Sequence, residues 1–265
     1  MSMEGLSDRR SPPILFSRPI HEWISRVDRK RTELAAIELS EAARDHLEQW
    51  IEIEFTHSML LFGGLDIPRP EIEQFVLRST LGGDARPADQ SIHRVIEAFR
   101  LIRSTVRGDG PGAALSPELL SRINSVWSDE GLRKSDLDSS RGLRSVLQAH
   151  VPAAVEAACR WFAAPSFMEL HPLERAGIVL LRLIEIHPFE KHNESTAFVA
   201  ASLHLLPAGL PPVIIAPDKR SAFRAALEEG LRMNTKPIVE VLAESAEAVL
   251  SSLIARSPQE GLPAR

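Results

Sequence analysis

The chain has 265 residues, of which 44% are hydrophobic and 25% charged, a composition that excludes a disordered or fibrous protein. Its formal net charge of -5 provides no overall positive field that would direct it to nucleic acid. The single cysteine, Cys159, excludes an internal disulfide and is interpreted as a packing residue in a reducing compartment. Residues 1–10 lack a secretory signal, and no apolar run is long enough to cross a bilayer. We therefore expect a cytoplasmic protein without a membrane partner.

The N-terminal part of the chain shows mainly helical periodicity. Residues 1–16 give little reason to fold on their own, so we expect a mobile arm there. Gly63 and Gly64 should form a left-handed cap at the end of the helix that is predicted to begin at Ser40. Apolar residues that recur every three to four positions predict helices beginning near Ile20 and spanning Ser40–Leu61, Pro70–Leu81 and Pro87–Val106.

The C-terminal part is also mainly helical after a break at Gly108–Gly112. Ser116 followed by Pro117 is typical of a helix start, because serine caps the helix and proline suits its first turn. Periodicity is lost over Asp129–Ala149, which predicts an exposed loop or short hairpin, and Val213–Ile215 predicts an extended connector. Helices are predicted over Pro152–Ala163, Pro172–Ile186, Ser195–Leu205, Asp218–Leu231 and Pro237–Ile254, so the fold class is all-α.

The segment after Ile186 is predicted to place a histidine beside a helix N-terminus. Pro188 disfavours helical geometry at His187, so the helix should stop there, and Ser195 or Thr196 can cap the next helix. The unpaired N–H groups and positive dipole end of that helix suit a phosphate. A histidine across the loop can take a proton from an attacking hydroxyl. On these physical grounds alone, a structural histidine in an ordinary turn explains the same residues more simply.

The sequence His187-Pro188-Phe189, followed by Asn193, resembles the Fic family motif His-Pro-Phe-x-(Asp/Glu)-Gly-Asn-Gly-Arg-x-x-Arg. The resemblance extends on both sides of the loop, from about residue 40 to about residue 250. The other segments that carry it are Leu115–Leu120, Gly131–Arg133, Pro172–Ala176, Ile186, Ala208–Val213, Arg220–Leu227 and Lys236–Glu240.

The resemblance implies an all-α, Fic-type helical bundle with a short β-hairpin or loop flap near residues 132–147 that includes Arg133. Together with the mobile arm at 1–16, this divides the chain into N-terminal helices at 17–110, which include the segment 56–64, a Fic-like core at 111–254 and a tail at 255–265. Fic proteins typically transfer AMP from ATP to a hydroxyl of a target protein, with a bound magnesium ion. ATP and Mg are therefore the implied ligands and a target protein is the implied partner, while homo-oligomer formation is left open.

Three residues of the loop keep the types that the Fic motif requires. By the resemblance, His187 is the general base, and Phe189, which follows Pro188, anchors the loop in the core. Asn193 is expected to contact the α-phosphate. The position of the motif's acidic metal ligand holds Lys191, which could contact a phosphate instead.

The rest of the motif differs in this chain. Glu190 is acidic but stands one position before the metal ligand, and His192 and Glu194 replace two glycines that let the backbone approach a phosphate. Ser195 and Phe198 replace two arginines, and each lost charge-assisted hydrogen bond costs about 1.5–3 kcal/mol. The carboxylate of Glu194 should also repel a phosphate at the helix N-terminus. Binding of ATP and Mg is therefore expected to be weak or absent.

An earlier helix resembles the inhibitory motif (Ser/Thr)-x-x-x-Glu-Gly-Asn of many Fic proteins, within residues 56–64. Ser58 matches its first position, Phe62 replaces the glutamate, and Gly63 and Gly64 follow. In the family the glutamate pairs with the second arginine of the loop motif, whose position holds Phe198 here. We therefore predict that the Phe62 and Phe198 rings pack together. Taken alone, the segment is simply a helix that ends in glycine.

Two functions remain open from the sequence. The first is a divergent Fic-type adenylyltransferase whose activity is impaired or altered, with His187 as base. The second is a catalytically inactive pseudoenzyme that acts as a protein-binding or regulatory module. A metal site built from His187, His192 and Glu190 or Glu194 is disfavoured, because their spacing crosses a proline-containing loop and no paired helical histidines support it.

Overall fold

The computed structural model describes residues 20–78, 86–108, 115–137 and 146–257. The arm expected at 1–16, most of the tail at 255–265 and the middle of the flap lie outside these ranges. Within them the chain is helical, and the only β-type pairing is an isolated antiparallel bridge between Leu132 and Phe189. The all-α prediction is confirmed, and the described parts of the flap form no hairpin.

The α-helices of the described residues run in chain order from α1 to α11. They are α1 (Ile20–Ala35), α2 (Glu41–Phe62), α3 (Arg69–Arg78), α4 (Pro87–Gly108), α5 (Pro117–Asn124), α6 (Val151–Phe162), α7 (Pro165–Met168), α8 (Pro172–Ile186), α9 (Asn193–Ser202), α10 (Arg220–Leu231) and α11 (Lys236–Arg256). Short 3₁₀ turns are η2 (Gln148–His150), η3 (Leu206–Ala208) and η4 (Pro217–Lys219). No helix among the described residues is long and apolar enough to cross a membrane.

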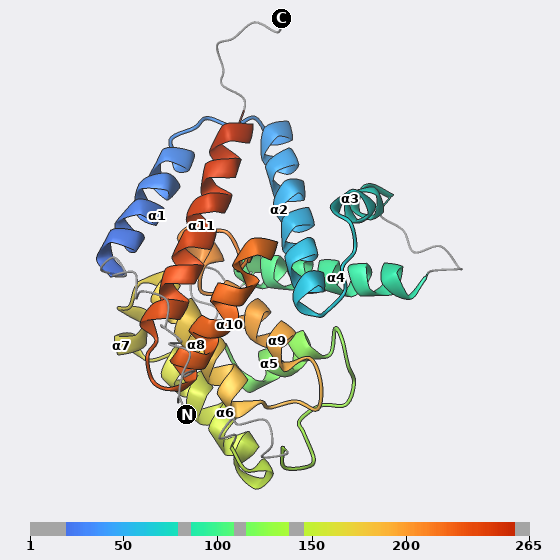
Figure 1. Cartoon of the computed structure of the whole chain (residues 1–265), viewed down its shortest axis with the longest axis vertical. Coiled ribbons are helices and arrows are strands. Elements are labelled where there is room, and N and C mark those ends of the chain that lie inside the picture. The colour runs from blue at the N-terminus through green and yellow to red at the C-terminus, as the bar shows by residue number, and fades with distance from the viewer. Residues whose placement is uncertain (1–19, 79–85, 109–114, 138–145, 258–265) are drawn as a thin grey trace, which may run out of the picture.

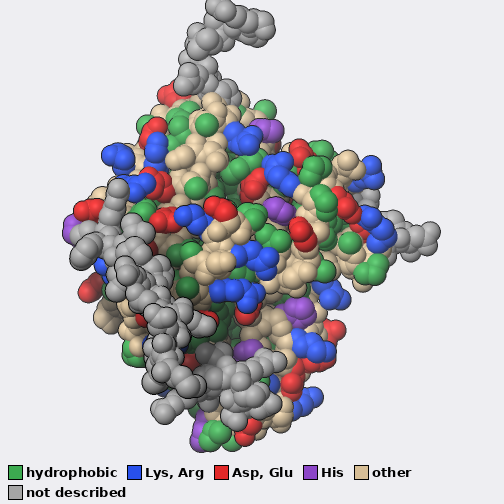
Figure 2. Space-filling view, in the orientation of Figure 1, with side chains coloured by type: hydrophobic (Ala, Val, Ile, Leu, Met, Phe, Trp, Pro, Cys, Tyr) green, Lys and Arg blue, Asp and Glu red, His purple; other side chains and the backbone are tan. Residues whose placement is uncertain are grey.

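Helix α8 lies at the centre of the core, in contact with α6, α9, α10 and α11 (Figure 1). Its apolar residues are buried on almost every side, as the sequence predicted for this helix. Gly177 lets α11 approach closely, because a Cβ there would lie 3.3 Å from side-chain carbons of Ile238 and Val239. The long helices α1, α11 and α2 extend from this core, and α4 crosses beside α2. On the visible face, basic and acidic side chains are interspersed (Figure 2).

Several helix ends follow the local sequence signals. Helix α2 ends at Phe62 with Gly63 as its C-cap, and Gly64 adopts the predicted left-handed conformation with φ 83°. Ser116 caps α5 by accepting a hydrogen bond from the backbone N–H of Leu119 at 3.1 Å. The start of α9 was predicted wrongly, because the helix begins at Asn193, before Ser195. The short helix α7 was not predicted, and α9 ends at Ser202 before the predicted Leu205.

The extended connector at Val213–Ile215 is buried, and side chains from neighbouring helices bind three of its backbone groups. Ser58 of α2 accepts a hydrogen bond from Ile215 N at 2.9 Å and donates one to Ile215 O at 3.1 Å. Ser202 of α9 accepts from Val213 N at 3.0 Å. These contacts explain how an irregular segment runs through the interior, and they attach α2 to the C-terminal half of the chain.

The turn after α9 buries a histidine in an aromatic cluster. The ring of His204 packs edge-on against Phe162 at 6.5 Å and Phe167 at 5.7 Å, and its Nε2 atom has no hydrogen-bond partner. Burial, together with the nearby Arg175 cation, lowers the pKa of His204 to about 4. In the same region, burial and the Glu118 charge raise the pKa of the Cys159 thiol to about 11, as expected for a packing residue.

Protonation of His204 should destabilise the fold as the pH falls. The folded-state pKa lies below the value of about 6.5 for an unfolded histidine, so the unfolded chain binds the extra proton first. The neutral histidine therefore contributes no penalty above pH 6.5, and roughly 3 kcal/mol of stability is lost between pH 6.5 and pH 4. Urea unfolding across this range should show a shallower loss in His204→Leu than in the unsubstituted chain.

The matched control is His46→Leu, because His46 is exposed on α2 and its substitution should leave the pH dependence unchanged. If stability falls equally steeply with decreasing pH in the unsubstituted chain and in His204→Leu, the role of His204 in this loss is contradicted.

Candidate functional site

His187 occupies the predicted position at the C-terminal end of α8. Its backbone is left-handed, with φ 50° and ψ 61°, and its N–H donates to Leu183 O at 2.9 Å. Pro188 prevents the helix from continuing. His192, at the other end of the loop, is also left-handed, with φ 60°. Both ends of the loop are therefore histidines in a left-handed conformation, which non-glycine residues adopt infrequently.

The shape of the loop depends on the side-chain amide of Asn193. The amide accepts a hydrogen bond from Phe189 N and donates one to Phe189 O, both at 2.8 Å. Asn193 is 4% exposed and the Phe189 side chain is buried in the core, in agreement with the anchoring expected for it. The Asn193 amide was expected to contact an α-phosphate, but in the structure its hydrogen bonds stabilise the backbone of the loop.

Arg133 connects the flap segment to the loop from inside the protein. It is 2% exposed, and its guanidinium donates to His187 O at 2.9 Å, to Ser135 O at 2.8 Å and to Val146 O. Its backbone N–H donates to Pro188 O at 2.9 Å. Arg133 therefore joins both described ends of the flap to the carbonyl of the candidate base.

One exposed ion pair and one hydrogen bond connect the loop to Glu130, just before the flap, and to Lys134 at its beginning. Lys191 Nζ lies 2.7 Å from Glu130 Oε1, and this carboxylate raises the pKa of Lys191. The Glu190 carboxylate accepts from Lys134 N at 2.6 Å. Because exposed pairs contribute little stability, Lys191 can be redirected to an anion more easily than Asn193.

The N-terminus of α9 faces the loop, as predicted, but its cap differs from the prediction. His192 is the N-cap and makes no capping hydrogen bond through its side chain. Ser195 and Thr196 lie inside the helix, and the Thr196 hydroxyl donates to His192 O at 2.8 Å. Glu194 is exposed in the first turn, where its carboxylate lies near the positive end of the helix dipole.

Sequence reasoning missed two residues of α5 and the turn after it that support this N-terminus. Asn124 donates to Lys191 O at 2.9 Å and to the Thr196 hydroxyl at 3.0 Å. The Trp127 ring stacks on His192 with centroids 6.2 Å apart. Burial, followed by the nearby Arg94 and Lys191 cations, lowers the pKa of His192. A buried asparagine at the end of a short helix was the available signal, but its partners are more than 60 residues away.

The predicted contact between Phe62 and Phe198 is confirmed. Their ring centroids are 5.0 Å apart, and Phe223 of α10 completes a three-ring cluster at 5.1 Å from Phe62 and 5.2 Å from Phe198. Phe198 and Phe223 are fully buried, while the Arg220 guanidinium lies 5.5 Å from the centroid of the half-buried Phe62 ring. Helices α2, α9 and α10 therefore meet through aromatic rings, and Phe223 is the member that the sequence did not single out.

Loss of the Asn193 amide should destabilise the loop. In Asn193→Ala, the buried N–H and carbonyl of Phe189 lose their partners, which should lower the free energy of unfolding by about 2–4 kcal/mol in urea titrations. The exposed Asn234→Ala is the matched control and should change stability by less than about 0.5 kcal/mol. Similar losses in the two variants would contradict a specific role for Asn193.

The aromatic cluster can be tested by a double-mutant cycle. Phe62→Leu, Phe198→Leu and the double variant should show a coupling of about 0.5–1.5 kcal/mol in the free energy of unfolding, because the two rings contact each other. The matched cycle combines Phe62→Leu with Phe162→Leu, whose ring contacts Trp161, Phe167 and His204. A coupling of the same size in both cycles would show that it does not arise from ring contact.

Comparison with known proteins agrees with this geometry. Residues 114–205, which include the loop and α9, match the Fic/DOC family. A protein adenylyltransferase fic-1 from Caenorhabditis briggsae is 32% identical over 94 residues, covering 36% of this chain and 18% of the relative. A protein adenylyltransferase Fic from Drosophila erecta is 32% identical over 91 residues, covering 34% and 18%. The chain therefore spans less than a fifth of the length of these relatives.

Solved structures extend the similarity of fold to most of the chain. A Fic-1 fragment from Caenorhabditis elegans matches with a TM-score of 0.73 and 17% identity, covering 89% of this chain and 72% of that chain. A Fic domain-containing signaling protein from Bacteroides thetaiotaomicron matches with a TM-score of 0.74 and 16% identity, covering 92% and 99%. The described chain thus has an all-α, Fic-like fold, and its residues 114–205 match the Fic/DOC family.

Proposed function

We propose that this chain is a divergent Fic-type transferase in which His187 acts as the base and nucleotide transfer is strongly reduced or altered. The observation that carries the proposal is the position of His187 across a short loop from the N-terminus of α9, inside the matched family domain. The substrate would be a target protein that presents a hydroxyl group. A cytoplasmic location, expected from the single cysteine, remains part of the proposal.

The reduction in activity is proposed from the residues that replace the phosphate-binding part of the Fic motif. His192 and Glu194 stand where the motif has glycines, and Ser195 and Phe198 stand where it has arginines. The exposed Glu194 carboxylate repels a phosphate about 4 Å away by roughly 1 kcal/mol in water and about 4 kcal/mol at an effective dielectric of about 20. Phe198 provides an apolar ring where an arginine would bind an anion.

The residues present do not fit the magnesium ion that the resemblance implied. Lys191 brings a positive charge to the position of the acidic ligand, and the Glu190 carboxylate is bound by the backbone N–H of Lys134. The described part of the chain contains no group of three acidic, histidine or cysteine side chains suited to a metal ion. Lys191 is the remaining group that could neutralise phosphate charge beside the loop.

The second candidate function is a pseudoenzyme that binds a protein or regulatory ligand without transfer. Two observations favour it: the Asn193 amide is bound to the Phe189 backbone through both its oxygen and its nitrogen, and the Phe62–Phe198–Phe223 cluster places apolar rings beside α9. Both features leave few partners for a triphosphate.

Transfer can be measured with ATP labelled on the α-phosphate, a panel of candidate proteins and the chain itself as acceptors. Slow incorporation that is lost in His187→Ala is expected. A repaired variant, His192→Gly with Glu194→Gly and Ser195→Arg, should raise the rate by at least about tenfold, because a gain of about 1.4 kcal/mol is sufficient for that. His46→Ala is the matched histidine control and should retain full incorporation.

Thermal shifts with a panel of nucleotides separate the two candidates. Stabilisation by at least one nucleotide, increased in the repaired variant, supports the transferase. The absence of both stabilisation and His187-dependent incorporation, in the original and repaired chains, would overturn it and favour the pseudoenzyme.

A further inference from the structure

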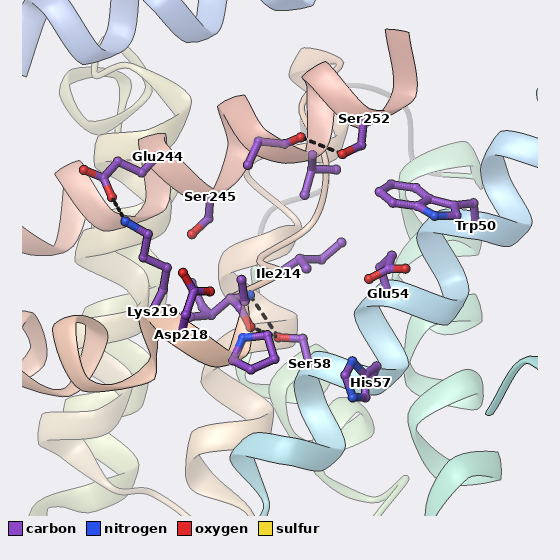
Figure 3. Close-up of a pocket in the computed structure, with 15 residues that line it drawn as sticks. Trp50, Glu54, His57, Ser58, Ile214, Asp218, Lys219, Glu244, Ser245 and Ser252 are labelled. Carbon is purple, nitrogen blue, oxygen red and sulfur yellow. Dashed lines mark hydrogen bonds and ion pairs between the residues drawn. The ribbon is translucent and has the colours of Figure 1, made fainter. Parts of the chain in front are cut away.

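A cavity of about 330 Å³ lies away from the loop, between α2, the connector with η4, and α11 (Figure 3). Its volume is within the range of about 300–1,000 Å³ that is usual for small-molecule sites. Trp50, Glu54 and His57 of α2 form one wall in Figure 3, and Glu244 and Ser245 of α11 lie opposite. The connector and η4 lie between these walls and complete the lining.

Two polar atoms of the lining are buried without a hydrogen-bond partner. They are the indole Nε1 of Trp50 and the hydroxyl oxygen of Ser245, a residue that is 8% exposed. Buried polar groups in native proteins nearly always have partners, so these two indicate a missing one. Ile214, Pro217 and Val249 contribute apolar surface to the same space.

The charges around the cavity favour a cationic group. Lys219 lies 2.8 Å from Glu244, and its pKa is raised by that hydrogen bond and by the nearby Asp218. Glu54 is also paired with a cation, because its Oε1 atom lies 2.6 Å from Arg69 Nε. Asp218 is exposed at the cavity near Lys219, but among the described residues the salt bridge of Lys219 is made with Glu244. A positive ligand group beside Asp218 would therefore complete the charge balance of the lining.

The cavity is distinct from the loop site but shares α2 with it. Ser58 lines the cavity and is bound to the backbone of Ile215, while Phe62, one turn later, contacts Phe198 of α9. A ligand in the cavity would thus contact the helix that supplies one ring of the aromatic cluster.

We propose that this cavity binds a small organic amine with an apolar body and a hydroxyl or carbonyl oxygen. The ammonium group would lie by Asp218, the apolar body against Ile214 and Val249, and the oxygen within reach of Trp50 Nε1 or the Ser245 hydroxyl. The inference does not depend on nucleotide transfer at His187.

Tyramine is a suitable probe, because it joins a phenol to a primary ammonium. Its neutral counterpart is tyrosol, in which a hydroxyl replaces the amine, and its anionic counterpart is 3-(4-hydroxyphenyl)propanoate. Titration of the full chain by NMR should shift the indole N–H signal of Trp50, assigned by its absence in Trp50→Phe. Tyramine should bind at least about fivefold more tightly than tyrosol, and the propanoate should not bind.

Two variants test where the probe binds. Asp218→Asn should weaken tyramine about fivefold while leaving tyrosol unchanged, and Ala248→Trp on the exposed rim should block both. Glu228→Gln, an exposed carboxylate on α10 outside the cavity, is the matched charge control and should leave tyramine binding unchanged.

The expected dissociation constant of tyramine is on the order of a millimolar. The proposal is overturned if 10 mM tyramine fails to shift the Trp50 signal. It is also overturned if binding persists unchanged in Ala248→Trp, provided that circular dichroism shows this variant to be folded. Equal affinity for tyramine and tyrosol would refute the amine preference.

Discussion

The loop between α8 and α9 depends on two hydrogen bonds between the Asn193 amide and the backbone of Phe189. The short loop must leave one helix at a left-handed His187 and enter the next at a left-handed His192, so its backbone polar groups have few regular partners. Asn193 satisfies both groups of the buried Phe189, and Arg133 secures the His187 carbonyl from the flap side. The position of the candidate base therefore follows from polar contacts in the interior.

Beside this loop, the protein places aromatic rings at the positions where the Fic motifs that it resembles have an ion pair. Phe62, Phe198 and Phe223 join α2, α9 and α10 through ring contacts that need no counter-charge and are insensitive to salt. Such a cluster stabilises the helix junction but provides no donor for an anion. Stability at this junction and phosphate binding are thus in conflict, which is the physical basis for proposing reduced transfer.

Helix α2 connects the parts of the molecule that matter for function. Its last turn supplies Phe62 to the aromatic cluster, and Ser58 binds the buried connector before α10. The preceding turns form one wall of the cavity, where Trp50 also contacts the Arg256 guanidinium at 4.9 Å. The cavity wall and the aromatic cluster therefore lie on either side of Ser58 on α2, at the point where this helix is hydrogen-bonded to the connector.

Local sequence determined which segments are helical, where α8 ends and how α2 is capped, because periodicity, Pro188 and Gly64 act on nearby backbone. The pairing of Phe62 with Phe198 was predictable only through the Fic resemblance. Sequence reasoning misplaced the start of α9, because a left-handed His192 occupies the N-cap position without a side-chain capping hydrogen bond. Tertiary structure alone decided three features: the hydrogen bonding of Asn193 to Phe189, the third ring of the aromatic cluster, supplied by Phe223, and the cavity beside Ser245. They depend on residues brought together from distant parts of the chain, and no local pattern encodes which side chains will meet.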